Sequence, residues 1–343
     1  MADSPDDIQS ISQLGEQELI RRFFTKQSSS GKDSVVGIGD DCAVLDLDSE
    51  NYRLVSTDQL LEGIHFLPSI STPADIGYKS AAVNISDIAS MSGRPTGIFL
   101  SLGFPSTTGV SWAKQFADGF FKLCSKYDIP LLGGDTTGSK QGIVINVTIF
   151  GIVKKENLKL RSDAKVDDVV CVTGTLGDAA AGFQVLQAGL KSDRDKGITW
   201  LAKKHRRPSP AVEQGQWLGD QSAVHAMIDL SDGLATDGKH LAEASNREIC
   251  INTEQMPFSE PFEKYTNGNK ELRRQLALGG GEDYQLLLTV AGDEFNTVNK
   301  NFENRFGHPL YRIGTVKEGK RNLIFLDYGK IIEQSNAEFN HFQ

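Results

Sequence analysis

Hydrophobic positions recur along the first half of the chain with the periods of both helices and strands. Spacings of three and four residues indicate amphipathic helices, and alternating or short continuous apolar runs indicate strands. Thr72-Pro73-Ala74-Asp75 resembles a helix start, because threonine can cap a helix and proline suits its first turn. The elements expected here are helices over 16–26, 73–91 and 110–127 and strands over 53–57, 96–102 and 142–154.

The apolar pattern lapses over 154–168 and restarts at Val169, which marks a domain boundary. A chain of 343 residues is longer than one core usually fills, so we expect two domains, over 1–154 and 155–343. Strands and helices mix in both halves without a strict β-α-β rhythm, which favours an α+β fold. The second half is expected to contain strands over 169–172, 223–229 and 284–290, each of the first two followed by a helix, and a polar loop over 259–271.

The net charge of −9 argues against non-specific binding to nucleic acid or to an anionic membrane. If the substrate is also anionic, cations have to mediate its binding. No apolar run reaches the ~18 residues of a membrane span, and the start of the chain lacks a signal pattern, so a cytoplasmic protein is expected. The four cysteines form no C-x-x-C pair, which predicts reduced thiols rather than a zinc site or disulfides.

Asp87 is the only charged residue of the segment SAAVNISDIASMSG, inside the helix expected over 73–91. At ~100° per residue it shares a face with Ile76, Val83 and Met91, so its carboxylate would be buried. A buried carboxylate usually caps a backbone group or pairs with an arginine. Alternatively, Asp87 and Asn84, one turn earlier, supply oxygen ligands to a hard cation.

Further carboxylates end apolar stretches in separate segments, often beside glycine or a hydroxyl residue. Turns favour Asp and Gly in any protein, so each segment alone says little. Their number, and the shortage of lysine and arginine beside them, indicates several Mg²⁺ ions, which bind carboxylate oxygens and share substrate phosphates. These carboxylates are Asp40, Asp41, Asp58, Asp135, Asp229, Asp232, Glu282 and Asp283.

The common nucleotide-binding motifs do not occur in the sequence. There is no GxxxxGK[ST] loop and no protein-kinase catalytic loop. The glycines over 174–182 resemble a dinucleotide-binding loop without matching its fingerprint, so a close helix–strand turn is the simpler interpretation.

Eight segments together resemble the thiamine-monophosphate kinases, in the superfamily of aminoimidazole ribonucleotide synthetase, and they occur in order over nearly the whole chain. The segments are "GIGDDCAV", "STDQLLEGIHF", "NISDIASMSGRP", "LLGGDTTGS", "LRSDAK", "VTGTLGDAAAG", "IDLSDGL" and "GGGEDYQLLLT". The resemblance implies a two-domain α+β homodimer, in which strands of both N-terminal domains form a shared β-barrel. It also implies that ATP and several Mg²⁺ ions phosphorylate thiamine monophosphate directly to thiamine diphosphate.

The resemblance also implies roles for individual positions. The implied metal ligands are Asp40, Ser56, Thr57, Asp58, Asp87, Asp135, Asp229 and Asp232, of which Asp58, Asp87, Asp135 and Asp229 form the catalytic group. The implied ATP contacts are Gly134, Asp135, Arg161 and Ser231, and the implied substrate contacts are His65, Glu282 and Phe339. The sequence departs from the family at Cys42, where alanine is usual, and at Asp163, where glycine is usual; neither departure removes a ligand.

The residue types fit this chemistry. The acceptor is a phosphate monoester with a second pKa of ~6, so it is mostly a dianion and needs no general base. His65 is therefore better interpreted as a substrate contact than as a proton acceptor. Residue type alone leaves other interpretations: a solvated linker charge for Arg161, ordinary burial for Phe339, and helix capping for Ser231 and Asp232.

Two other functions are alternatives to the phosphorylation of thiamine monophosphate. Another ATP-dependent enzyme of the superfamily would keep the metal and nucleotide site and change the substrate. Selenophosphate synthetase would need a reactive N-terminal cysteine, whereas the first cysteine here is Cys42, and a hydrogenase-maturation protein would need a cysteine-bearing tail. A non-catalytic ATP/Mg sensor would bind ATP without releasing ADP.

Overall fold

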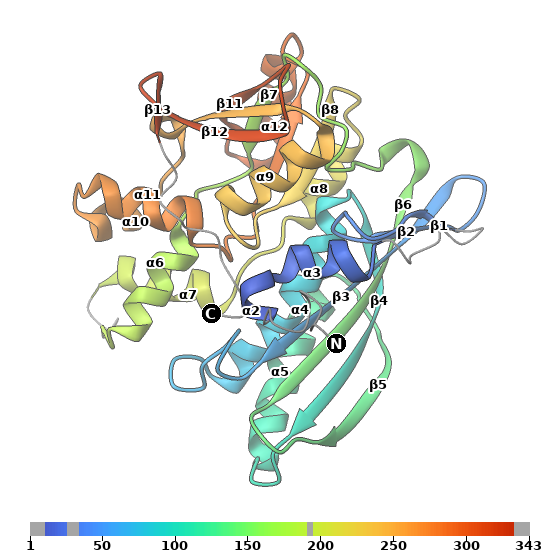
Figure 1. The fold of residues 1–343 in the computed structure, drawn as a ribbon. Helices are drawn as coiled ribbons and strands as arrows, with labels where there is room; N and C mark the ends of the chain where they lie inside the picture. Colours follow the sequence, from blue (N-terminus) through green and yellow to red (C-terminus); the bar gives the residue numbers. More distant parts are fainter. Residues whose placement is uncertain (1–10, 26–33, 191–194, 333–343) are drawn as a thin grey trace, which may run out of the picture.

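The computed structural model describes residues 11–25, 34–190 and 195–332. In these ranges the chain forms two β-sheets with their own helices, the sheet of the first half at the bottom of Figure 1 and that of the second half at the top. This confirms the expected two-domain mixture of helices and strands.

The first sheet has six strands in the order β1-β2-β3-β6-β4-β5. Most neighbours pair antiparallel, whereas β4 and β5 pair in parallel because a helix, α5, connects them. The strands are β1 (Ser34–Val36), β2 (Ala43–Asp46), β3 (Asn51–Leu61), β4 (Arg94–Phe104), β5 (Leu131–Gly138) and β6 (Val144–Lys154). The helices of this half are α2 (Ile11–Leu14), α3 (Glu16–Phe23), α4 (Pro73–Ser90) and α5 (Val110–Lys126).

Helix α4 begins as the sequence predicts. The Thr72 hydroxyl accepts a hydrogen bond from the Asp75 N–H at 3.2 Å, and the Asp75 carboxylate accepts one from the Thr72 N–H at 3.3 Å. Helix α5 packs so closely on α4 that a Cβ on Gly119 would lie 1.9 Å from the carbonyl oxygen of Ala74. The two helices bury one face of the sheet, whose opposite face carries polar or partly exposed side chains such as Thr57 and Phe99.

The second sheet has seven strands in the order β13-β12-β9-β11-β7-β10-β8, antiparallel except for the β9–β12 pair. Helix α9 packs on one face and α12 on the other, so two apolar clusters enclose the sheet. The strands are β7 (Val169–Val172), β8 (Val224–Asp229), β9 (Glu248–Asn252), β10 (Leu286–Val290), β11 (Tyr311–Lys317), β12 (Asn322–Asp327) and β13 (Lys330–Ile332). The helices are η1 (Lys155–Asn157), α6 (Asp178–Gln187), α7 (Lys196–Arg206), α8 (Val212–Gly219), α9 (Leu234–Ser245), η3 (Thr253–Gln255), α10 (Glu260–Thr266), α11 (Lys270–Gly279) and α12 (Phe295–Phe306).

The prediction of a polar loop over 259–271 is wrong, because α10 and the start of α11 occupy this range. The Ser259 hydroxyl caps α10 by accepting a hydrogen bond from the Phe262 N–H at 3.2 Å. The Phe262 side chain is fully buried and anchors the helix. The polar side chains that suggested a loop lie on the solvent face of these helices.

Helix α4 also connects the two domains. A Cβ on Gly215 of α8 would lie 2.1 Å from the carbonyl oxygen of Ala89 on α4, so only glycine permits this approach. Tyr284, which precedes β10, is buried in the core of the first domain. None of the helices in the described ranges combines the length and the apolar character that crossing a bilayer requires.

Candidate active site

Five carboxylates from separate parts of the chain act on one another where the domains meet, and we call them the acidic cluster. The acidic cluster consists of Asp40 and Asp41 before β2, Asp58 on β3, Asp87 on α4 and Asp229 at the end of β8. Burial raises the pKa of Asp87 well above its usual value, and the charges of Asp58 and Asp229 raise it further. Burial and the charge of Asp41 likewise raise the pKa of Asp229. Asp87 and Asp229 are therefore harder to ionise than solvent-exposed aspartates.

Two serines orient carboxylates of the cluster. The Ser56 hydroxyl donates to Oδ2 of Asp87 at 2.5 Å, and the Ser86 hydroxyl donates to Oδ2 of Asp229 at 2.5 Å. Ser56 belongs to β3, where alternation places it and Asp58 on the face toward α4. Each carboxylate keeps further oxygen lone pairs for other partners.

Arg161 is the cation that contacts the acidic cluster. The Arg161 guanidinium pairs with the carboxylate of Asp41, and its Nε lies 3.4 Å from Oδ1 of Asp40. The backbone N–H of Arg161 donates to Oδ2 of Asp40 at 3.2 Å. Only 14% of the Arg161 side chain is exposed, so it is not the solvated linker charge that residue type alone allowed. Burial and the neighbouring Asp41 raise the pKa of Asp40 to about 6 despite the guanidinium.

The chemistry of these donors fits divalent cations. Oδ2 of Asp41 is buried and has no hydrogen-bond partner among the residues that the structure describes. A buried carboxylate oxygen without a partner is costly unless a cation neutralises it. Carboxylate and hydroxyl oxygens on rigid elements are the donors that Mg²⁺ prefers. The residues that could hold Mg²⁺ here are Asp40, Asp41, Ser56, Asp58, Asp87 and Asp229.

Asn84, the other candidate ligand on α4, makes local hydrogen bonds instead. Its Oδ1 accepts from the Asp58 N–H at 3.2 Å, and its Nδ2 donates to the Ser80 carbonyl at 3.1 Å. The Asn84 amide thus fixes the backbone that carries Asp58. Cys42 lies at the edge of the cluster, where its thiol donates to the Asp87 carbonyl at 3.3 Å and burial raises its pKa.

Ser231 and Asp232 lie in the turn between β8 and α9. The helix begins at Leu234, and Gly233 rather than Ser231 or Asp232 occupies its cap position. A group that could hold a metal ion lies here and consists of Asp232, Asp237 and His240. Each residue offers one ligand atom, and these three atoms lie within 4.8 Å of one another. The buried Asp237 carboxylate also accepts from the Asp232 N–H at 3.1 Å and fixes this turn.

Glu282 lies in a different electrostatic setting. Its carboxylate forms an ion pair with Lys79 of α4 and lies 2.9 Å from Nδ1 of His205 on α7. Although burial opposes ionisation, Lys79 and His205 lower the pKa of Glu282 to about 2. Glu282 adopts φ 61°, a left-handed conformation that is uncommon outside glycine and often marks a functional position.

The predicted residues of β5 lie apart from the acidic cluster within the chain. The register places Gly134 level with Asp58 across β6 and β4, a separation of three strand spacings or roughly 14 Å. Strand alternation directs Asp135 and Thr57 to the face of the sheet opposite Asp58. The Thr57 hydroxyl lies 3.0 Å from the hydroxyl of Thr148 on that face.

His65 and Phe339 are the remaining predicted substrate contacts. Nδ1 of His65, in the turn after β3, accepts a hydrogen bond from the Leu61 N–H at 3.0 Å, which fixes the ring orientation. Phe339 lies outside the described residues.

Comparisons with known proteins agree with this architecture. Residues 39–153 match the family model "AIR synthase related protein, N-terminal domain", and residues 165–327 match "AIR synthase related protein, C-terminal domain". The chain is 38% identical over 328 residues to the thiamine-monophosphate kinase of Escherichia coli (strain K12), covering 96% of this chain and 98% of that protein. The chain therefore belongs to the thiamine-monophosphate kinases.

Other thiamine-monophosphate kinases support the same assignment. The Bacillus subtilis (strain 168) protein is 35% identical over 311 residues, covering 90% of this chain and 94% of that protein. The solved structure "AaThiL complexed with AMPPCP and TMP" matches with a TM-score of 0.82 and 31% identity, covering 96% of this chain and 98% of that one. The fold is thus the two-domain fold of AIR synthase-related proteins, and the chain is an enzyme of the kinase class.

Membership in the thiamine-monophosphate kinases did not by itself indicate every residue of the site. Lys79 and His205 were missed, although Lys79 is the one basic residue of α4 and is buried. Asp41 was noticed as a carboxylate but not assigned as a ligand, because its neighbour Asp40 matched the family motif. No local signal distinguishes His205 from other histidines, since its partner Glu282 lies 77 positions away.

Proposed function

We propose that the protein transfers the γ-phosphoryl group of ATP directly to thiamine monophosphate, giving thiamine diphosphate and ADP. The observation that carries this proposal is the acidic cluster, in which burial and neighbouring carboxylates raise the pKa values of Asp87 and Asp229. A related protein has been solved with AMPPCP and TMP, and the curated relatives are thiamine-monophosphate kinases, which supports the choice of both substrates.

In the proposed reaction an oxygen of the substrate phosphate attacks the γ-phosphorus in line with the bond to ADP. That bond breaks and its electron pair leaves on the β-phosphate oxygen. The acceptor is already a dianion near neutral pH, because its second pKa is ~6, so no side chain has to remove a proton. This matches a site with many carboxylates and no histidine in the acidic cluster.

Several Mg²⁺ ions bound to the acidic cluster would neutralise the phosphate oxygens of both substrates. We assign Asp40, Ser56, Asp58, Asp87 and Asp229 as ligands, with Asp58, Asp87 and Asp229 as the catalytic group. Asp232, with Asp237 and His240 beside it, is the candidate for a further metal. Arg161, which Asp40 and Asp41 hold in place, and Ser231 are assigned to ATP.

Glu282 and His65 are assigned to the thiamine part of the substrate. The thiazolium ring of thiamine carries a positive charge, and Glu282 is kept ionised by Lys79 and His205. A fixed carboxylate attracts a cationic ring and would orient it. Phe339 stays a proposed stacking partner.

A homodimer would explain why Asp135, Gly134 and Thr57 lie away from the acidic cluster. Strand β5 is an edge strand with Leu131 40% and Leu132 54% exposed, and such an edge can pair with another chain. We propose that the first sheets of two copies close into a shared β-barrel. Residues 1–154 would then bind ATP and Mg²⁺ and dimerise, and residues 155–343 would complete the site, in the cytoplasm where ATP is supplied.

The test is a discontinuous assay with purified protein, ATP, Mg²⁺ and thiamine monophosphate, and chromatographic separation of the products. Free thiamine serves as a parallel acceptor. Thiamine diphosphate is expected from the monophosphate alone, with one ADP for each product molecule. Release of ADP without thiamine diphosphate would overturn the substrate assignment, and ATP binding without any turnover would indicate a sensor.

A further inference from the structure

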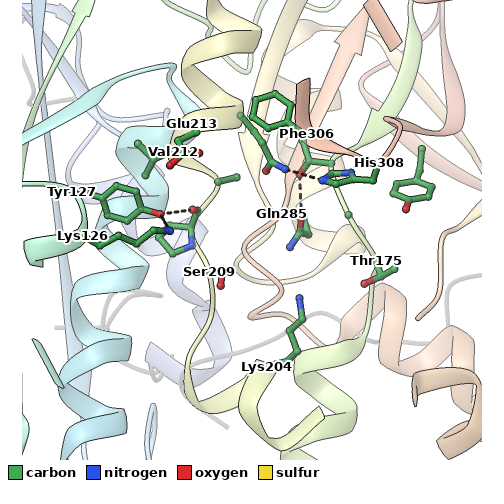
Figure 2. Close-up of a pocket in the computed structure, with 16 residues that line it drawn as sticks. Lys126, Tyr127, Thr175, Lys204, Ser209, Val212, Glu213, Gln285, Phe306 and His308 are labelled. Atoms are coloured by element: carbon green, nitrogen blue, oxygen red, sulfur yellow. Dashed lines mark hydrogen bonds between the residues drawn. The ribbon is translucent and has the colours of Figure 1, made fainter. Parts of the chain in front are cut away.

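A cavity of about 480 Å³ lies between the two domains and is separate from the residues assigned to the reaction (Figure 2). Its wall contains none of the acidic cluster and neither Glu282 nor His65. The first domain contributes Lys126 and Tyr127 at the end of α5, and the rest comes from the loop before α6, from α7, from residues 209–214 and from the second sheet. A volume of this size suits a small molecule of one or two rings.

The charge of the wall favours an anion. Figure 2 shows the ammonium group of Lys204 pointing into the cavity toward Gln285. Within the described ranges this ammonium forms no salt bridge and lies 4.9 Å from the ring centroid of Trp200. Among the described residues that line the cavity, Lys126 is the second cation and Glu213 is the one carboxylate. A positive cavity in a chain of net charge −9 indicates selection for a negative ligand.

Lys126 is held at the cavity by a chain of hydrogen bonds. Its ammonium donates to the Tyr127 hydroxyl at 2.8 Å, and this hydroxyl donates to the Pro210 carbonyl at 3.3 Å. The bonds connect α5 of the first domain to the segment before α8. An occupant that binds Lys126 and Lys204 would therefore bridge the two domains.

Flat side chains form another part of the wall. The His308 and Tyr311 rings stack with centroids 6.5 Å apart and an interplanar angle of 11°. Nδ1 of His308 lies 3.2 Å from the Pro309 carbonyl, so it carries the proton and donates, and Nε2 accepts from the Gln214 amide at 3.2 Å. Both ring nitrogens thereby contact protein groups, so the imidazole offers the cavity its flat face.

We propose that this cavity binds a second small molecule, a phosphate ester carried on a flat ring, at a site distinct from the one that binds thiamine monophosphate. Lys204 and Lys126 bind the phosphate, and the rings of His308, Tyr311 and Phe306 contact the organic part. Lys204 directly precedes His205, which holds Glu282, and Gln285 lies three positions after Glu282. Binding of a ligand in the cavity is thus transmitted to His205, which positions Glu282, the proposed thiamine contact.

The test is calorimetric titration of the full chain with phenyl phosphate in EDTA, where the acidic cluster repels anions. Inorganic phosphate and phenol are parallel ligands that each lack one half of the probe. Saturable binding of phenyl phosphate, weaker binding of phosphate and no binding of phenol are expected. Absence of saturable binding of phenyl phosphate up to about 10 mM would overturn the proposal.

Four variants test whether phenyl phosphate binds in this cavity. Lys204→Met should weaken binding about tenfold or more, Lys204→Arg should retain most of it, and Lys203→Met, at the exposed neighbouring position of α7, should have no effect. Ser209→Trp adds a ring at an exposed residue of the rim and should block binding without removing a charge. Circular dichroism checks that each variant folds. Binding that is equal in wild type, Lys204→Met and Ser209→Trp would place the ligand elsewhere and contradict the proposal.

Discussion

The acidic cluster and Glu282 both lie near the domain boundary, and their environments produce opposite ionisation. In the acidic cluster, burial and mutual repulsion raise the pKa values of Asp87 and Asp229. At Glu282 burial acts in the same direction, but Lys79 and His205 more than offset it and lower the pKa to about 2. Burial alone therefore does not determine the charge of these groups; the partners do.

The difference in ionisation indicates that Glu282 and the acidic cluster have different functions. Glu282 has a counter-charge, the Lys79 ammonium, built into the protein and stays an anion of fixed orientation, which suits it to position a ligand. Within the described part of the chain, Arg161 pairs with Asp40 and Asp41 of the acidic cluster, and the raised pKa values of Asp87 and Asp229 favour uptake of protons or metal ions there. The following experiments change one side of this comparison at a time.

The largest effect is expected for Asp87→Asn. Removing a proposed metal ligand should lower kcat by about a thousandfold or more, since the charge on the phosphates is no longer neutralised. The free energy of unfolding of the metal-free protein should stay unchanged or rise by up to about 2 kcal/mol, because a repelled buried acid is removed. Activity assays and denaturant unfolding measure both quantities.

Asp46→Asn is the matched control for this variant, because Asp46 is an exposed acid that pairs with Lys155. It should change neither activity nor stability appreciably. Unchanged turnover in Asp87→Asn would refute the assignment of Asp87 as a metal ligand.

Glu282→Gln should have the opposite effect on stability. Without the carboxylate, Lys79 is left buried and unpaired, at 6% exposure of its side chain, and the free energy of unfolding should fall by about 3 kcal/mol. The KM for thiamine monophosphate should rise more than the KM for ATP. Glu260→Gln, which removes the exposed pair with Lys264, is the control and should leave the free energy of unfolding measurably unchanged. A variant as stable as wild type would show that the ion pair is not the difference between the two regions.

The pH dependence of stability should also differ between Asp40 of the acidic cluster and Glu282. The pKa of Asp40 is about 6 in the folded state and near 3.8 when unfolded, so the folded state holds more protons between these values. Asp40 alone should therefore lower the free energy of unfolding of the metal-free protein by about 2 kcal/mol from pH 4.5 to pH 7, and Asp283, whose pKa burial raises to about 7, acts in the same direction. Glu282, with its lowered pKa, loses its stabilising charge only below about pH 4.5 and contributes no change in this window. Denaturant unfolding in EDTA across the window measures the slope, and stability that rises with pH would contradict the raised pKa.

The smallest effect is expected for Ser86→Ala. It removes the hydroxyl that orients the Asp229 carboxylate and should lower kcat about tenfold at limiting Mg²⁺, with less effect at saturating Mg²⁺. Ser90→Ala on the same helix is the control, because the Ser90 hydroxyl donates to the Asp87 backbone carbonyl rather than to a carboxylate. Equal Mg²⁺ dependence in both variants would mean that the Ser86 hydrogen bond does not organise the site.

Local signals in the sequence predicted much of the fold. The cap of α4 followed from Thr72 and Pro73, and the buried strand β7 from its run of apolar residues. Helix α10 was missed because its exposed polar side chains outweighed one buried anchor, Phe262, whose burial depends on tertiary packing. Such packing has no local signature.

The candidate site was predictable where a residue interrupts an apolar pattern. Asp87 was found in this way, as one acid in an apolar helix. The ion pairs of Glu282 were not, because they join segments that only the fold brings together. The placement of Asp135 also escaped sequence reasoning, since the register across β3, β6, β4 and β5 determines it.

The most direct test of the central claim, that the acidic cluster is a cation site, is the effect of Mg²⁺ on stability. We would measure the free energy of unfolding at pH 7.5 in EDTA and in excess Mg²⁺ for wild type, Asp87→Asn and Asp229→Asn. At a hundred times the Kd, Mg²⁺ should stabilise wild type by about 2.7 kcal/mol and the two variants by much less. If Mg²⁺ does not stabilise wild type, or stabilises all three proteins equally, the acidic cluster is not the metal site.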